Sequence, residues 1–94
     1  MGMKQKIMIV DDAEINRQIL MAILGDKYEY VQAENGCQAV HMLQHDLTID
    51  LILLDINMPE MNGFQMLERM NKFHWIDEIP VIMINKKKKR DIIE

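Results

Sequence analysis

The chain has 94 residues, room for one small domain, and its 49% hydrophobic and 28% charged residues are typical of a globular protein rather than a disordered one. No apolar run approaches the roughly 20 residues of a membrane-spanning helix, and a single cysteine, Cys37, excludes an internal disulfide and a cysteine-built zinc site. Residues 1–85 carry 6 basic and 13 acidic side chains, a balance that does not suit a nucleic-acid-binding protein, which would show a basic face.

The chain start carries no sign of a secretory leader. Residues 1–6 lead straight into an apolar run of four residues, which is too short for the core of a signal peptide. Together with the single cysteine, this predicts a cytoplasmic protein with no membrane association.

The first half of the chain predicts two strands and a helix between them. Residues 7–10 are apolar without polar alternation, which indicates a strand buried on both faces of a sheet. Ile15, Ile19, Ala22 and Ile23 then recur at helical spacing and predict the apolar stripe of a helix. Residues 28–33 alternate between polar and apolar, which favours a strand at the edge of the sheet.

The second half repeats this alternation of strands and helices. It predicts a helix marked by Ala39, Val40 and Leu43, an apolar strand at 51–54, a helix marked by Phe64, Leu67 and Met70, and an apolar strand at 81–84. Strands that alternate with helices are typical of right-handed crossovers and a parallel sheet, so we expect an α/β sandwich of three layers. Residues 86–94 open with five consecutive basic residues and form a separate basic segment, the start of a fourth helix or a frayed tail, after the domain of residues 1–85.

Carboxylates follow two of the apolar strands directly. Asp11 and Asp12 come after the first strand and Asp55 after the third. Because ligands bind at the carboxyl ends of parallel strands, we expect these side chains to share one cleft. Two carboxylates about 4 Å apart repel by roughly 4 kcal/mol at an effective dielectric constant near 20. The cluster therefore predicts proton uptake or a bound hard cation such as Mg²⁺.

A purely structural role for each aspartate is the alternative. Asp11 or Asp12 would be the N-cap of the first helix, with Glu14 as the capping-box partner of Asp11. Asp55 would open a turn ahead of Met58 and Pro59. The combination of all three acidic residues with the Met-Pro turn disfavours this alternative.

At these residues the sequence resembles the receiver domains of two-component response regulators. The resemblance rests on the apolar strand that ends in Asp11 and Asp12, on residues 50–63, where Asp55 is followed by Met-Pro and Gly, and on residues 79–84. It covers residues 5–84. It implies a flavodoxin-like three-layer sandwich with a parallel sheet of order 2-1-3-4, incomplete because the fifth strand and last helix are missing.

The resemblance also implies a function and a set of site residues. Asp55 corresponds to the phosphoacceptor, a carboxylate that takes a phosphoryl group from a sensor histidine kinase or a phosphotransfer protein. Asp11, Asp12 and Asp55, with the backbone carbonyl of Asn57, correspond to the ligands of a Mg²⁺ cofactor. Such a module is a phosphoacceptor and not an enzyme in the ordinary sense.

Two features depart from the pattern of this family. Asn85 stands where receivers carry the Ser or Thr that contacts the phosphoryl group and couples it to a switch. The lysine at the end of the fifth strand has no counterpart, and one of Lys86–Lys89 is an alternative source of that positive charge.

A fourth strand at the edge of the sheet has a consequence for assembly. An apolar edge exposes backbone donors and acceptors, so we expect a homodimer through residues 81–84 or an exchange of elements between two chains. The alternative to a working phosphoacceptor is accordingly a truncated receiver fragment that folds and self-associates without phosphorylation-driven switching.

Other residues with possible chemistry have simpler interpretations. His41 and His45 are one helical turn apart but lack a third zinc ligand, so we expect both to face solvent. Cys37, near the start of the second helix, is expected to be a small packed residue.

Overall fold

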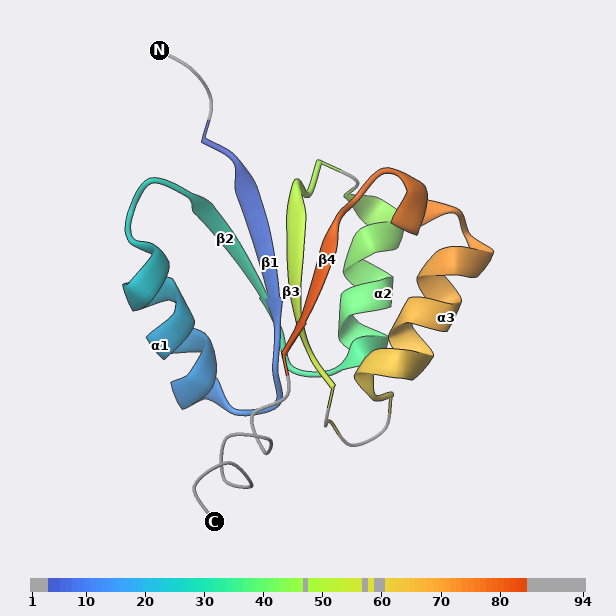
Figure 1. Ribbon diagram of the computed structural model, residues 1–94, viewed down its shortest axis with the longest axis horizontal. Coiled ribbons are helices and arrows are strands. Elements are labelled where there is room, and N and C mark those ends of the chain that lie inside the picture. Colours follow the sequence, from blue (N-terminus) through green and yellow to red (C-terminus); the bar gives the residue numbers. More distant parts are fainter. Residues whose placement is uncertain (1–3, 47, 57, 59–60, 85–94) are drawn as a thin grey trace.

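The computed structural model of the protein describes residues 4–46, 48–56, 58 and 61–84. These residues form four strands, three α-helices and one short 3-10 helix, η1, and Figure 1 shows how they are arranged. The elements are β1 (Lys6–Val10), α1 (Glu14–Leu24), β2 (Glu29–Ala33), α2 (Gly36–His45), β3 (Leu51–Asp55), α3 (Gly63–Lys72), η1 (Trp75–Asp77) and β4 (Val81–Ile84).

The four strands form one parallel sheet in the order β2-β1-β3-β4. This confirms the predicted order, with β2 at one edge and β4 at the other. The central strands β1 and β3 are buried along four of their five residues, because both faces of each are covered. Of the described residues, those of β4 pair with β3 alone.

Helices lie on both faces of the sheet, α1 on one and α2 with α3 on the other (Figure 1). Successive side chains of a strand point to opposite faces, so β1 contributes to two cores. Ile7 and Ile9 pack with Leu53 against α1. Met8 and Val10 belong to the larger core, which α2 and α3 cover. The predicted three-layer sandwich is therefore confirmed.

The buried stripe of α1 differs from the prediction. Ile15, Ile19 and Ile23 are 63%, 49% and 73% exposed, so the stripe chosen from their spacing faces solvent. The helix instead packs against the sheet through the partly buried side chains of Leu20, Met21 and Leu24. The sequence 19–24 is apolar on both sides of the helix, and only the position of α1 over the sheet decides which side is buried.

Two further burial predictions are wrong. The unbroken apolar run of β4 predicts burial on both faces, but Ile82 is 52% exposed. Its side chain shares a face with Leu53, and the one helix on that face in the described chain, α1, lies beside β1 and β2 rather than over β4 (Figure 1). Phe64 was expected on the buried face of α3 and is 61% exposed, whereas Met66 and Met70 of that helix are fully buried. Phe64 lies in the first turn of α3, where the helix reaches the end of the sheet.

Candidate functional site

The three aspartates lie together at the carboxyl ends of β1 and β3. Val10 and Leu54 are paired in the register of these two neighbouring strands, so Asp11 and Asp55 follow side by side. Asp11 and Asp55 are 3% and 1% exposed, and Asp12 is exposed at the mouth of the site. One carboxylate oxygen from each aspartate lies within 4.8 Å of the other two. The structure thus brings together the residues that the sequence placed in one cleft.

Hydrogen bonds to neighbouring segments hold the backbone around Asp11. The amide of Asp11 donates to the carbonyl of Ala33 on β2 at 3.0 Å, which extends the pairing of β1 with β2 by one residue. The amide of Ala13 donates to Asp11 Oδ1 at 2.9 Å. The guanidinium of Arg17 donates from Nη1 to the carbonyl of Asp11 at 2.7 Å.

The N-cap alternative for the first two aspartates is wrong. The N-cap of α1 is Ala13, and no side chain caps this helix. Asp11 instead binds the amide of Ala13 itself, and this short turn leads the chain from β1 into α1. By contrast, Asn35 and Asn62 cap α2 and α3 with their side chains, and Gln65 completes a capping box with Asn62.

Asp55 is positioned by the close approach of α3 to the end of β3. The amide of Ile56 donates to the carbonyl of Ile84 on β4 at 3.0 Å, and the amide of Gly63 donates to the carbonyl of Ile56 at 3.0 Å. A Cβ atom at Gly63 would lie 2.9 Å from the carbonyl oxygen of Asp55, closer than such contacts occur. Only glycine allows the start of α3 to sit this near the site.

The charges and spacing of the site fit a divalent cation. The three carboxylate oxygens lie no more than 4.8 Å apart, and two unit charges at that limit repel by about 3.5 kcal/mol at an effective dielectric constant of 20. Ligand oxygens about 2.0–2.1 Å from Mg²⁺ lie up to about 4.2 Å apart across the ion, so small side-chain adjustments bring all three oxygens to one ion. Oxygen donors of this kind are those that Mg²⁺ prefers. In the described part of the chain, these three aspartates form the one group of three or more Asp, Glu, His or Cys side chains that could hold a metal ion.

Some predicted residues cannot be placed in this geometry. Asn57, Asn85 and the basic segment 86–94 lie outside the described residues. His41 and His45 both face solvent, as expected, with their rings 4.9 Å apart in an edge-to-face arrangement. Neither histidine belongs to the aspartate cluster.

Sequence reasoning missed Arg17, whose side chain is 7% exposed and contacts the main chain of the site. A signal for it exists in the sequence. Arg17 precedes Leu20, Met21 and Leu24 by three, four and seven residues, which is the spacing of one helix face. Choosing this stripe as the buried one would have placed the arginine inside the protein.

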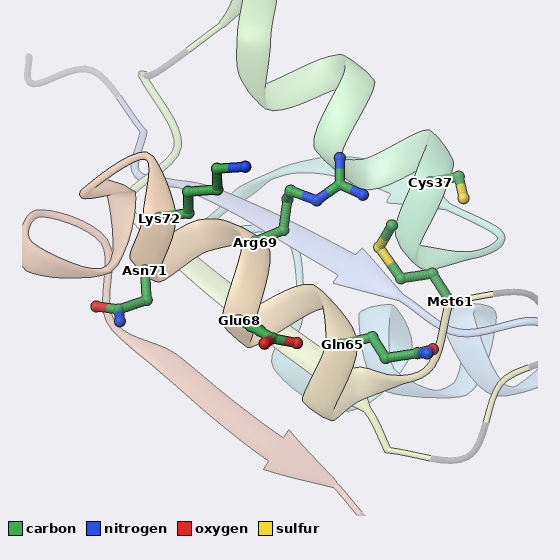
Figure 2. A pocket seen from close by; sticks show the side chains of 7 residues that line it. All are labelled: Cys37, Met61, Gln65, Glu68, Arg69, Asn71 and Lys72. Carbon is green, nitrogen blue, oxygen red and sulfur yellow. The ribbon is translucent and has the colours of Figure 1, made fainter.

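A groove of about 550 Å³ lies between α2 and α3 and is shown in Figure 2. Cys37 and Met61 line one side of it, and Arg69 and Lys72 of α3 line the other. None of the three aspartates contributes to its walls, so this groove is separate from the carboxylate site. Cys37 is exposed here, which corrects the expectation of a packed residue, because it lies on the outer side of α2.

Comparison with known proteins identifies relatives over most of the chain. The family model of the response regulator receiver domain matches residues 7–94. The two-component response regulator ORR3 of Oryza sativa subsp. indica is 31% identical over 80 residues, which cover 84% of this chain and 61% of that protein. Response regulator RR06 of Streptococcus pneumoniae is 35% identical over 80 residues, 84% of this chain and 35% of that protein. The chain therefore spans about three fifths or less of the length of these curated relatives.

Solved structures with the same fold include bacterial response regulators. The chemotaxis response regulator CheY4 of Vibrio cholerae has a TM-score of 0.78 and 30% identity, over 86% of this chain and 68% of that chain. The response regulator TrrA of Thermotoga maritima, in complex with Mg²⁺ and BeF, has a TM-score of 0.77 and 29% identity, over 86% of this chain and 69% of that chain. Among the described residues, no helix combines the length and the apolar character that crossing a membrane requires.

Proposed function

The chain belongs to the response regulator receiver domain family, and we propose that it accepts a phosphoryl group on Asp55 in a two-component relay. The observation that carries this proposal is the meeting of Asp11, Asp12 and Asp55 at the carboxyl ends of β1 and β3. The donor in this proposal is a sensor histidine kinase or a phosphotransfer protein. The proposed role is that of a phosphoacceptor in the cytoplasm, with phosphotransfer and dephosphorylation as its only chemistry.

Asp55 is the proposed nucleophile. One carboxylate oxygen of Asp55 forms a bond to phosphorus while the bond between phosphorus and the donor's histidine nitrogen breaks, and the product is an acyl phosphate. Asp55 is 1% exposed at the end of β3, and this burial restricts the movement of its side chain. Such fixed positioning is the main contribution that a protein makes to phosphoryl transfer.

The proposed cofactor is Mg²⁺, held by Asp11, Asp12, Asp55 and the backbone carbonyl of Asn57. When bound, the ion neutralises the negative charge of the equatorial phosphoryl oxygens. The fit of the three carboxylates to one ion supports this assignment, as does the Mg²⁺ complex of the similar protein from Thermotoga maritima. Asn85 is proposed to contact the phosphoryl group through its side-chain amide at the position of the family's Ser or Thr.

The test is intact-mass spectrometry after incubation with acetyl phosphate and Mg²⁺. We expect the unaltered chain to gain one phosphoryl group and Asp55→Ala to gain none. Asp26→Ala is the matched control, because Asp26 is an exposed aspartate in the turn after α1. Chelation of the metal with EDTA should abolish the gain. Phosphorylation of Asp55→Ala, or none in the folded unaltered chain, would overturn the proposal.

The proposed partner in assembly is a second copy of the chain, bound through β4. Ile52 donates to the carbonyl of Pro80 and Ile56 to that of Ile84, so alternate residues of β4 face β3. The backbone groups of Val81 and Met83 therefore point to the open side of the sheet. The exposed side chain of Ile82 adds apolar area beside them. These findings concern association alone. They give no support to the alternative in which the chain self-associates but does not accept a phosphoryl group.

A further inference from the structure

Arg17 is a buried charge whose two hydrogen-bond acceptors are neutral. Its side chain is 7% exposed, and its Nε donates to Gln32 Oε1 at 2.9 Å while Nη1 donates to the carbonyl of Asp11 at 2.7 Å. No ion pair of Arg17 occurs among the described residues. Removing a charge from water costs several kcal/mol, and two neutral acceptors offset this only in part. A methionine of similar length would fill the same space on α1 without that cost, so packing alone does not explain an arginine here.

The two hydrogen bonds join three segments around the aspartate site. Arg17 comes from the second turn of α1, Gln32 from β2, and the carbonyl of Asp11 from the end of β1. That carbonyl belongs to the peptide that joins Asp11 to Asp12. The preceding peptide is held by the hydrogen bond from the amide of Asp11 to Ala33. The peptide planes on both sides of Asp11 are thus fixed, and with them the directions in which the two carboxylates leave the backbone.

We propose that Arg17 is a positioning residue for the divalent cation, acting through the carbonyl of Asp11 with Gln32 as its brace. The role rests on the proposed function, because it concerns the cation of the same site. Residues that orient metal ligands typically contribute about 10- to 100-fold to metal affinity. The positive charge of Arg17 has the opposite effect, because it repels a cation bound nearby. Removing the arginine should therefore weaken cation binding if its positioning role dominates, and strengthen cation binding if its charge repulsion dominates.

The experiment measures Mn²⁺ binding, with free Mn²⁺ followed by electron paramagnetic resonance and Mg²⁺ added as competitor. Arg17→Met should raise the Kd for Mn²⁺ by about tenfold. Arg17→Lys keeps the charge but cannot span both acceptors, so it should weaken binding to a smaller extent. Gln32→Met keeps the arginine, removes its brace and should also weaken binding. Arg69→Met, an exposed arginine in the groove of Figure 2, is the matched control and should bind like the unaltered chain.

Unchanged or tighter Mn²⁺ binding by folded Arg17→Met would overturn the proposal. Urea unfolding of each variant distinguishes a positioning role from a purely structural one. A purely structural role would lower the free energy of unfolding without changing the Kd for Mn²⁺. If Arg17→Met does not fold, Gln32→Met decides, because Gln32 is exposed on an edge strand and unchanged binding there contradicts the brace. Phosphorylation is not the readout. A chain that binds Mn²⁺ but gains no phosphoryl group refutes the proposed function and leaves this inference standing.

Discussion

Single atoms decide how the site is built, and Gly63 is the clearest case. Its missing Cβ leaves room for the carbonyl of Asp55 and the Cα of Ile56, both 2.9 Å from where that atom would lie. Gly25 is required for a different reason. It ends α1 with φ at +89°, and nothing lies within 4 Å of its missing Cβ. One glycine is thus demanded by close packing and the other by backbone conformation.

Gly63→Ala should therefore damage both stability and the site. The new methyl group meets backbone atoms that cannot move aside, so we expect a loss of about 1–3 kcal/mol in the free energy of urea unfolding. Phosphorylation of Asp55 should slow in the same variant, because α3 and the end of β3 must separate. Gly25→Ala is the control: its backbone, with φ 89° and ψ −168°, lies in a region that essentially only glycine adopts, so the change should cost about 1–3 kcal/mol and leave the phosphorylation rate unchanged. Equal rates in both variants would contradict the role given to Gly63.

At the scale of elements, a polar network ties the end of α2 to the start of β1. Asp46 is the C-cap of α2, and its Oδ2 lies 3.1 Å from Lys6 Nζ of β1. The backbone amide and the hydroxyl of Thr48 donate to Asp46 Oδ1, and Lys6 Nζ also donates to the Thr48 hydroxyl at 2.9 Å. These contacts lie at the amino ends of the strands, opposite the aspartate site. They hold the connection between α2 and β3 in place.

The network predicts a pH dependence. The hydrogen bond from the Thr48 hydroxyl, then that from its amide, and then the contact with Lys6 lower the pKa of Asp46 from 3.8 to about 2. Since the folded pKa is below the unfolded one, the ionised carboxylate stabilises the fold above pH 3.8, and this contribution is lost as pH falls towards 2. We expect an NMR titration of Asp46 to give a midpoint near 2.

Thr48→Val should raise the midpoint of Asp46 towards its ordinary value, because it removes the hydroxyl that contributes most. Thr48→Ser keeps a hydroxyl and is the matched control, with a midpoint close to that of the unaltered chain. A midpoint near 3.8 in the unaltered chain would show that the network does not form in solution.

At the scale of the whole molecule, the two helical layers are unequal. Two helices cover one face of the sheet and one helix covers the other in the described chain, with α1 beside β1 and β2 in Figure 1. The exposed large apolar side chains include Ile15, Ile19 and Ile23 on α1 and Ile82 on β4. These side chains contribute little to the folded monomer, but Ile82 lies beside backbone groups of an edge strand that pair with no other strand among the described residues, where association is favoured.

Light scattering at increasing protein concentration tests the proposed homodimer. We expect the unaltered chain to reach the mass of a dimer and Ile82→Lys to remain monomeric, because a charge on an edge strand opposes pairing. Ile23→Lys is the control, since Ile23 is 73% exposed but lies on α1, away from the edge. A monomer at every concentration, or dissociation by Ile23→Lys and not by Ile82→Lys, would refute association through β4.

The sequence alone determined the order of elements, the parallel sheet and the convergence of Asp11, Asp12 and Asp55. Apolar runs and helical spacing are local signals, and acidic residues directly after parallel strands must emerge at one end of the sheet. Only the tertiary structure decided which side of α1 is buried, how far Ile82 is exposed and that Arg17 reaches the carbonyl of Asp11. These features depend on how elements distant in the sequence pack together, and the spacing of residues 15–24 is compatible with either face of the helix.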